Sequence, residues 1–506
     1  MSSKILRKLS PFKKPLKVLF ISAEVSPYVF VGGLGQVMKS LPSSLRKLGV
    51  DARIFMPKYA LIDEKKYPLE MIFEALRVPT DDPKNGDLIC NVKRYVPKEP
   101  DAPTYFLENM EYYEKRANVY GYSDDPIRFA LLCRGALEFL KNSDWIPDVI
   151  NATDWHTGFL PNYLKTRYAQ DPELSKITTV FSIHNLFHQG IFDHKTISEL
   201  DFDDGKSEIA PLFSERLAKQ NFMKRGIIYA DLVNTVSETY SKEILTKDYG
   251  EGLDDLLKEV RTKVFGVLNG IDYKELNPAT DKIIQFNFDL YELKKRIKNK
   301  THLQKEFNLD VSEEIPLLGM VTRLFEQKGI DLLFPIMEVL VSDFNLEFVI
   351  VGEGEAKYRD FFLEMAKKFP KKIGFHPISD FTLGRRVFAS CDIFLMPSKF
   401  EPCGLTQMEA MRYGAVPIVR KTGGLADTVE DFDPRENLGT GFLFEKFDST
   451  ALFGAIIRAI ETVKHKNAWQ GLVRRVMKAD FSWEASAKKY SDLYKKAIFF
   501  HFSSKI

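Results

Sequence analysis

One segment in the second half of the chain carries two cations close to the end of a predicted strand. Residues 321–329 read VTRLFEQKG, with Arg323 at the strand's end and Lys328 five residues later. A guanidinium fork and an ammonium group beside a helix N-terminus could hold a diphosphate and stabilise its charge as it leaves. The alternative is that both are surface cations that pair with nearby Glu326.

A second segment, residues 400–414 (FEPCGLTQMEAMRYG), combines two carboxylates with a loop that contains proline and glycine. Glu401 lies in the loop and Glu409 on the helix predicted to follow, so both could face a ligand at the helix start. The backbone N–H groups expected to point the same way are those of Cys403, Gly404, Leu405 and Thr406. Carboxylates with amides suit a polyhydroxyl ligand such as a sugar, although Glu401 could instead simply stabilise the helix N-terminus. Cys403 is not expected to be a nucleophile, because no partnering base is identifiable.

In the first half, two predicted strands end in polar and aromatic side chains. The segments are residues 151–156 (NATDWH) and 182–190 (SIHNLFHQG). The groups that we expect to line a site from this side are Asp154, Trp155, His156, His184 and Asn185. A single histidine at a strand end is more often structural, but clustering at strand termini favours a site.

Two glycine turns share a short motif. Residues 31–37 read VGGLGQV, with Gly32 and Gly33 in the turn, and residues 422–429 read TGGLADTV. Each follows a predicted strand and opens a predicted helix, so each could present backbone N–H groups to an anion. The alternative is that the glycines only ease a tight turn from strand to helix.

Short apolar runs rich in β-branched residues recur, each followed by a loop and a helical pattern. In the first half they cover residues 17–22, 52–57, 148–152, 178–183 and 232–237. A second series covers residues 316–324, 347–352, 373–376, 392–397 and 416–419. This alternation predicts parallel sheets with helices on both faces. We therefore expect an α/β protein with two Rossmann-like, doubly wound domains facing a central cleft, which is the expected ligand site.

The composition argues against several classes of protein. The chain has 506 residues, 44% of them hydrophobic, and a net charge of +2, so no global field favours nucleic acid or a membrane surface. No run approaches the roughly 20 apolar residues of a membrane span. The 4 cysteines form no CxxC pair, no zinc motif occurs and no metal site is predicted. We expect a cytoplasmic protein with a basic N-terminal tail over residues 1–16.

The motifs together resemble those of the bacterial glycogen synthase and plant starch synthase family, retaining glycosyltransferases of family 5 with the GT-B fold. The resemblance runs from about residue 17 to about residue 494. The stretches that carry it include VLFISAEVSPYVFVGGLGQV, NATDWHTGFLPNYLK, FSIHNLFHQGIF, GVLNGID, VTRLFEQKGIDLL and SKFEPCGLTQMEAMRYGAVPIVRKTGGLADTV. The combination of FEPCGLTQ with RKTGGLADTV is highly specific for this family.

The resemblance implies a division of the chain and a reaction. Residues 17–266 would form the acceptor-side domain and residues 267–480 the nucleotide-sugar-binding domain. Residues 481–506 would form a helix that crosses back to the first domain. The implied activity is transfer of glucose from ADP-glucose to the non-reducing end of an α-1,4-glucan with retention of the α anomer and without a metal. The sequence does not indicate an oligomeric state.

The resemblance also implies roles for individual residues. Arg323 and Lys328 would contact the donor diphosphate and favour its departure. Glu401 and Glu409 match the family's paired acids, and His184 and Asn269 match positions that contact glucose. Asp154 and Trp155 match the N-terminal wall of the cleft, and Cys403, Gly404 and Leu405 match the loop over the sugar hydroxyls.

The first glycine turn departs from the family pattern. The family normally reads Lys-x-Gly-Gly-Leu with an acid before the next Val, whereas this chain has Phe30 and Gln36 at those positions. The loss of a group that stabilises developing charge could slow the reaction by about 10² to 10³. Two alternatives therefore stay open: a related glucosyltransferase that uses UDP-glucose or another acceptor, and a non-catalytic glucan-binding relative.

Overall fold

The computed structural model describes residues 14–192 and 203–503. Within them the chain forms two compact units, each built around one sheet. The first unit comprises residues up to Val236, Ser241–Val267 and the C-terminal segment from Trp483, and the second comprises Ser237–Tyr240 and Leu268–Ser482. The first 13 residues of the expected basic tail lie outside the described residues.

The first unit contains a nine-stranded sheet in the order β3-β4-β5-β2-β1-β6-β7-β8-β9. Its strands are β1 (Lys17–Ile21), β2 (Asp51–Pro57), β3 (Glu70–Val78), β4 (Leu88–Tyr95), β5 (Thr104–Glu108), β6 (Val149–Thr153), β7 (Thr178–Ile183), β8 (Leu232–Thr235) and β9 (Val264–Gly266). From β5 to β9 all neighbouring pairs are parallel, and β6 and β7 are buried along their whole length. The strands are continuous apolar runs in sequence because a central parallel strand is covered on both faces.

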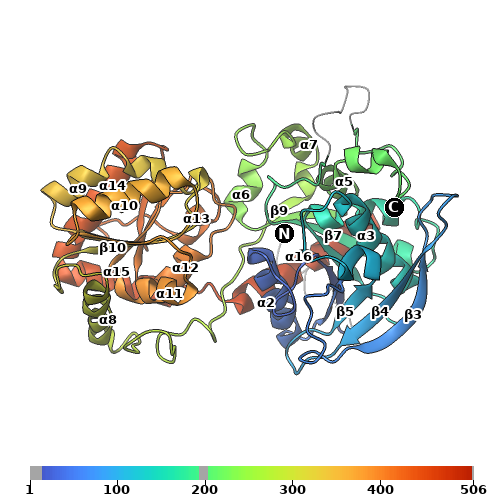
Figure 1. The fold of residues 1–506 in the computed structure, drawn as a ribbon, viewed down its shortest axis with the longest axis horizontal. Helices are drawn as coiled ribbons and strands as arrows, with labels where there is room; N and C mark the ends of the chain where they lie inside the picture. Colours follow the sequence, from blue (N-terminus) through green and yellow to red (C-terminus); the bar gives the residue numbers. More distant parts are fainter. Residues whose placement is uncertain (1–13, 193–202, 504–506) are drawn as a thin grey trace. The chain divides into compact units, whose positions relative to one another are not determined.

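An antiparallel hairpin extends one edge of this sheet, and the sequence analysis did not predict it. Strands β3 and β4 pair antiparallel, and β4 pairs antiparallel with β5. Much of β3 is exposed, so it lacks the continuous apolar run that marks a buried strand. Figure 1 shows the hairpin as the outermost part of this sheet.

The helices of the first unit include the last helix of the chain. They are α2 (Gly33–Lys47), α3 (Asp125–Lys141), α4 (Phe159–Lys165), α5 (Phe222–Tyr229), α7 (Asp254–Glu259) and α16 (Trp483–Ser503), with α6 (Glu238–Glu243) at the boundary of the two units. Two buried tyrosines fasten α16 to the sheet: Tyr494 Oη accepts from Asn151 Nδ2 at 3.0 Å, and Tyr490 Oη from Asn234 Nδ2 at 3.1 Å. The C-terminal helix is thus part of the first unit's core.

The second unit contains a six-stranded, fully parallel sheet in the order β12-β11-β10-β13-β14-β15. Its strands are β10 (Leu317–Val321), β11 (Glu347–Val351), β12 (Ile373–His376), β13 (Ile393–Met396), β14 (Val416–Arg420) and β15 (Phe442–Phe444). This is the 3-2-1-4-5-6 order of a Rossmann sheet, with the topological switch between β10 and β13. The corresponding switch in the first unit lies between β1 and β6.

Helices cover both faces of the second sheet (Figure 1). They are α8 (Leu293–Glu306), α9 (Met337–Asp343), α10 (Ala356–Lys368), α11 (Phe381–Ser390), α12 (Thr406–Arg412), α13 (Gly423–Thr428), α14 (Ser449–Lys464) and α15 (Lys466–Lys478). The expected pair of doubly wound α/β domains is confirmed.

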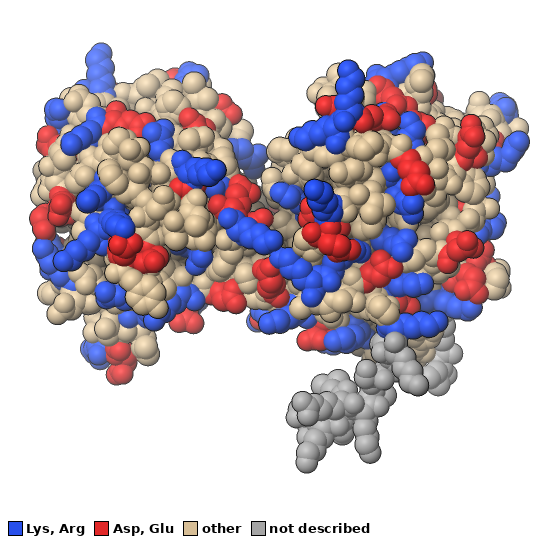
Figure 2. Space-filling model, turned by 90° about the horizontal axis from the view of Figure 1, so that it is seen from below, with Lys and Arg blue, Asp and Glu red and all other residues tan. Residues whose placement is uncertain are grey.

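The surface mixes charges of both signs. On the face drawn in Figure 2, blue Lys and Arg side chains alternate with red Asp and Glu side chains. None of the described helices is both long and apolar enough to cross a membrane.

Candidate active site

The strongest catalytic candidates of the second unit lie at the topological switch of its sheet. Lys328 follows β10, Glu401 follows β13, and Lys328 Nζ lies 2.6 Å from Glu401 Oε2. Ser398 Oγ donates a hydrogen bond of 3.1 Å to the same carboxylate oxygen. Glu326 pairs instead with Lys399, at 2.8 Å. The structure therefore brings together the two predicted residues and does not support the alternative pairing of Lys328 with Glu326.

Backbone contacts hold the two loops that carry this pair. Lys399 N donates to Gln327 O at 2.8 Å, and Gln327 Nε2 donates to Phe400 O at 3.1 Å. Gly329 has a φ of +68°, and a Cβ added there would lie 2.0 Å from Pro397 O. A glycine is needed at this position, because the loops approach too closely for a side chain.

Arg323 differs from Lys328 in its surroundings. Its side chain is exposed beside the Phe325 ring, 5.7 Å from the ring centroid. Among the described residues no carboxylate forms a salt bridge with it. Its guanidinium can therefore accept an anion from solution without first breaking an ion pair.

The loop between Glu401 and α12 is mostly buried. Burial raises the pKa of Cys403 to about 12, so the thiol stays protonated at neutral pH, as expected for a residue that is not a nucleophile. Buried Asn269 lies close to this cysteine, and its Oδ1 accepts no hydrogen bond from the described residues. Gly404 has a φ of +69°, Leu405 is half-buried, and Thr406 Oγ1 contacts Met396 Sδ at 3.4 Å.

Glu409 lies in an environment different from that of Glu401. Burial raises its pKa to about 7, Arg385 on α11 acts in the opposite direction, and Glu275 adds a further increase. Lys328 and Ser398, which contact Glu401, are not among these neighbours. Glu409 lies within α12, which packs on α11, and its charged neighbours Arg385 and Glu275 differ from the Lys328 that contacts Glu401.

The second glycine turn packs directly on the Glu401 loop. Gly424 N donates to Glu401 O at 3.1 Å. A Cβ at Gly423 would lie 2.0 Å from Glu401 O, and a Cβ at Gly424 would lie 1.9 Å from Cys403 O. These glycines are explained by backbone packing that positions Glu401.

The first glycine turn is held by a buried acid that sequence reasoning missed. The Glu24 carboxylate accepts hydrogen bonds from Val31 N and, at 3.2 Å, from Gly32 N. A Cβ at Gly33 would meet no atom within 4 Å. The signal available in the sequence was a lone acid directly after the apolar run of β1.

Asp154, at the end of β6, organises the neighbouring strand end. Its Oδ1 accepts from His184 N at 2.7 Å and from Asn185 N at 3.4 Å. Its φ of +54° is strained for a residue with a side chain. Burial raises the pKa of Asp154 to about 7, with a further increase from the charge of Glu24. Asp154 therefore orients the backbone at the start of the loop that follows β7.

The imidazole of His184 is available for a ligand. Burial lowers its pKa to about 4, so the ring is neutral at pH 7. Its Nε2 is buried and has no hydrogen-bond partner among the described residues. A neutral imidazole nitrogen in this state can bond a sugar hydroxyl without the cost of displacing another partner.

The two aromatic residues that precede α4 are packing groups. The rings of Trp155 and His156 lie 4.0 Å apart between centroids, and that of Trp155 lies 5.0 Å from Phe129. Burial holds the pKa of His156 well below its usual value. Trp155 is half-buried and His156 is buried.

Comparisons with known proteins agree with this geometry. Residues 17–259 match the model of the starch synthase catalytic domain, and residues 303–471 match that of glycosyl transferases group 1. The chain is 41% identical over 488 residues to a glycogen synthase of Thermotoga maritima, covering 96% of this chain and 99% of that one. It is 42% identical over 484 residues to a glycogen synthase of Thermosipho melanesiensis, with the same coverage.

A solved structure is also similar over nearly the whole chain. It is the catalytic domain of starch synthase IV from Arabidopsis thaliana, bound to ADP and acarbose, with a TM-score of 0.80 and 31% identity. The similarity covers 96% of this chain and 100% of that domain. The match of both halves, in order and at full length, shows that this chain belongs to the glycogen synthase and starch synthase family of glycosyltransferases, with the GT-B fold.

Proposed function

We propose that this protein transfers glucose from ADP-glucose to the 4-hydroxyl at the non-reducing end of an α-1,4-glucan, with retention of the α anomer. The observation that carries the proposal is the Lys328–Glu401 pair at the switch point of the second sheet, with exposed Arg323 beside it in sequence. The relative with ADP and acarbose bound supports a nucleotide donor and a glucan acceptor. The proposed compartment is the cytoplasm.

The charges of the second unit suit a leaving diphosphate. As the bond between the sugar and the phosphate breaks, negative charge grows on the diphosphate, and Arg323 and Lys328 would stabilise it there. This proposal includes no metal, because Arg323 and Lys328 supply the positive charge. Lys328 is already oriented by Glu401, so it needs little reorganisation when the donor binds.

The other groups orient the sugar. Glu401, held by Ser398 and by the second glycine turn, would accept hydrogen bonds from glucose hydroxyls. Asn269 Oδ1 and His184 Nε2 are buried atoms without partners among the described residues, and each could bond a further hydroxyl. In this assignment the leaving phosphate helps to deprotonate the acceptor, and Glu401 is not a nucleophile.

The test measures release of nucleoside diphosphate by the full-length protein with glycogen and either ADP-glucose or UDP-glucose, without added metal. Lys328→Gln should lower kcat by about 10² to 10³. Lys399→Gln is the matched control, because it removes a lysine from an exposed pair with Glu326 and should leave kcat nearly unchanged. Preference for UDP-glucose would contradict the proposed donor, and glycogen binding without turnover would show a non-catalytic relative.

A further inference from the structure

Arg420, at the end of β14, is a buried cation to which the proposed function gives no role. It is 8% exposed and opens the RKTGGLADTV stretch. The guanidinium donates from Nε to Ser398 O at 3.0 Å, from NH2 to Lys399 O, and from NH1 to Glu445 O at 3.4 Å. One side chain thus joins the main chain after β13 to the main chain after β15. Arg323, by contrast, is exposed and can take an anion from solution.

The main chain that Arg420 holds also carries the contacts of Glu401. Ser398 is fully buried, and its Oγ donates to Glu401 Oε2 at 3.1 Å. Lys399 N donates to Gln327 O at 2.8 Å, in the loop that carries the lysine partner of Glu401. Movement of residues 398–399 would therefore shift both the carboxylate and the loop of its lysine partner.

An aromatic ring lies beside both Arg420 and the loop of Lys328. The centroid of the Phe447 ring is 5.8 Å from Arg420 Cζ. Its Cε2 would lie 3.2 Å from a Cβ added at Gly329, the residue directly after Lys328. The arginine is therefore close to both loops that form the candidate site of the second unit.

We propose that Arg420 is a positioning residue for glucose transfer. It fixes the main chain at residues 398–399 and thereby orients the Glu401 carboxylate and its lysine partner. The inference rests on the proposed function, because that function gives both of these groups a part in the reaction. A guanidinium is a rigid fork of donors, whereas a lysine ammonium is a compact charge on a flexible stem. An arginine is therefore needed at this position for its geometry as well as its charge.

A second buried arginine of the same unit provides the matched control. Arg296 on α8 is 7% exposed, and it donates from Nε to Tyr413 O at 2.8 Å and from NH2 to Cys391 O. Cys391 precedes β13, whereas the carbonyls that Arg420 holds follow it. The two arginines thus use the same chemistry at opposite ends of one strand.

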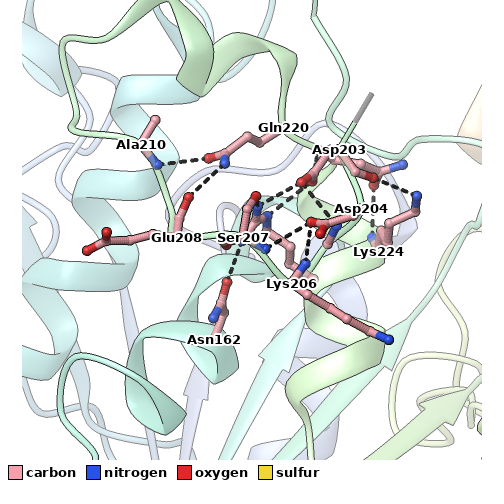
Figure 3. Close-up of polar contacts among 12 residues, drawn as sticks. Asn162, Asp203, Asp204, Lys206, Ser207, Glu208, Ala210, Gln220 and Lys224 are labelled. Atoms are coloured by element: carbon pink, nitrogen blue, oxygen red, sulfur yellow. Dashed lines mark hydrogen bonds and ion pairs between the residues drawn. The ribbon is translucent and has the colours of Figure 1, made fainter. Parts of the chain in front are cut away.

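The first unit contains a further buried arginine with different partners. Arg225 NH1 donates to Ser207 O at 2.7 Å and to Asn162 Oδ1 at 2.9 Å, and its NH2 lies 2.7 Å from Asp203 Oδ1. Figure 3 shows Asp203, Ser207 and Asn162 within this network. Because these partners include a carboxylate and belong to the other unit, Arg296 is the closer match to Arg420.

The experiment measures amide hydrogen exchange and turnover with glycogen in full-length Arg420→Lys and Arg296→Lys. Arg420→Lys should speed exchange in peptides from residues 397–405 about tenfold, because the loop loses hydrogen bonds that hold it closed. Its kcat should fall about 10- to 100-fold with the KM for ADP-glucose changed by less than about twofold, because the misplaced groups act mainly in the transition state. Arg296→Lys should lower Tm but leave kcat and exchange in that segment near the wild-type values.

Ser398→Ala tests the route from Arg420 to Glu401. It removes only the hydroxyl that donates to Glu401, and it should lower kcat about fivefold. In a double-mutant cycle, Arg420→Lys should cost at least about threefold less in the Ser398→Ala background than in the wild type, because both act on one carboxylate. Independent effects, which would multiply, would overturn the proposal.

The exchange measurement needs no substrate, so it separates this inference from the proposed function. Unchanged exchange at residues 397–405 in Arg420→Lys would overturn the inference whatever the donor is. Wild-type kcat in that variant, or an equal loss of kcat in Arg296→Lys, would overturn it as well. If Arg420→Lys does not fold, wild-type kcat in Ser398→Ala overturns it instead. No turnover of ADP-glucose by the wild-type protein would contradict the proposed donor, and the variants are then compared with UDP-glucose.

Discussion

The two glycine turns have similar sequences, but their conformations are held by different interactions. At the second turn, Gly423 and Gly424 lie so close to the carbonyls of Glu401 and Cys403 that no side chain fits. At the first turn, Gly33 has open space around its Cα, and the turn is held from outside by the Glu24 carboxylate. The second turn therefore positions a neighbouring loop, whereas the first leaves its surface accessible.

This difference shows that the sequence of a glycine motif does not indicate why its glycines are needed. Both turns follow a strand and open a helix, and the sequence alone allowed an anion site at each. Only the first keeps unfilled space at a glycine, together with exposed side chains at Phe30 and Val31. Substitutions that add one methyl group or change one charge can test this contrast between the two turns.

The largest effect on stability is expected for Gly424→Ala. Its Cβ would lie 1.9 Å from Cys403 O, so the backbone of the Glu401 loop must move. We expect the free energy of unfolding, measured by urea denaturation, to fall by about 3 kcal/mol. Gly33→Ala is the matched change at the first turn and should shift it by less than about 0.5 kcal/mol. Equal losses in the two variants would remove the distinction between the turns.

A smaller loss is expected for Glu24→Gln. The amide is a weaker acceptor for Val31 N and Gly32 N, so the first turn loses charge-assisted hydrogen bonds, at a cost of about 1 to 2 kcal/mol. Glu74→Gln, at an exposed position of β3, should have no measurable effect in the same denaturation assay. If Glu24→Gln is equally silent, the turn is held by its own backbone.

Asp154 should make stability depend on pH. Its pKa is raised from 3.8 to about 7, so the folded protein binds this proton more tightly than the unfolded chain does. The free energy of unfolding contributed by this group is therefore present at low pH and is lost as pH rises towards 7. Asp154→Asn should flatten that slope in urea denaturation between pH 4 and 8, and exposed Asp87→Asn should not. An unchanged slope would exclude Asp154 as its source.

The smallest effect on stability is expected at Phe30. Its side chain is 55% exposed, so Phe30→Lys should change the free energy of unfolding by less than about 0.5 kcal/mol. Turnover with ADP-glucose should nevertheless rise by about tenfold, because the lysine restores a cation near the accessible turn. Phe30→Ala is the control: it removes the ring without adding a charge and should not raise turnover. Unchanged turnover in Phe30→Lys would place this position outside the donor site.

The sequence by itself determined the α/β class, the two series of strands and the family, because continuous apolar runs and long motifs are local in the chain. It also brought Lys328, Glu401, Asp154 and His184 forward as site candidates, since polar groups at the ends of parallel strands meet at one sheet edge. The hairpin of β3 and β4 was not predicted, because β3 is largely exposed and neither strand has a continuous apolar run.

Only the tertiary structure decided which candidates contact one another. Lys328 and Glu401 lie 73 residues apart in the chain but form a pair, and Glu409 has Arg385 and Glu275 as its charged neighbours instead. The sequence likewise did not predict that Glu24 holds the first glycine turn or that backbone packing requires the glycines of the second. Such features depend on distances between segments far apart in the chain, and neither spacing nor composition records those distances.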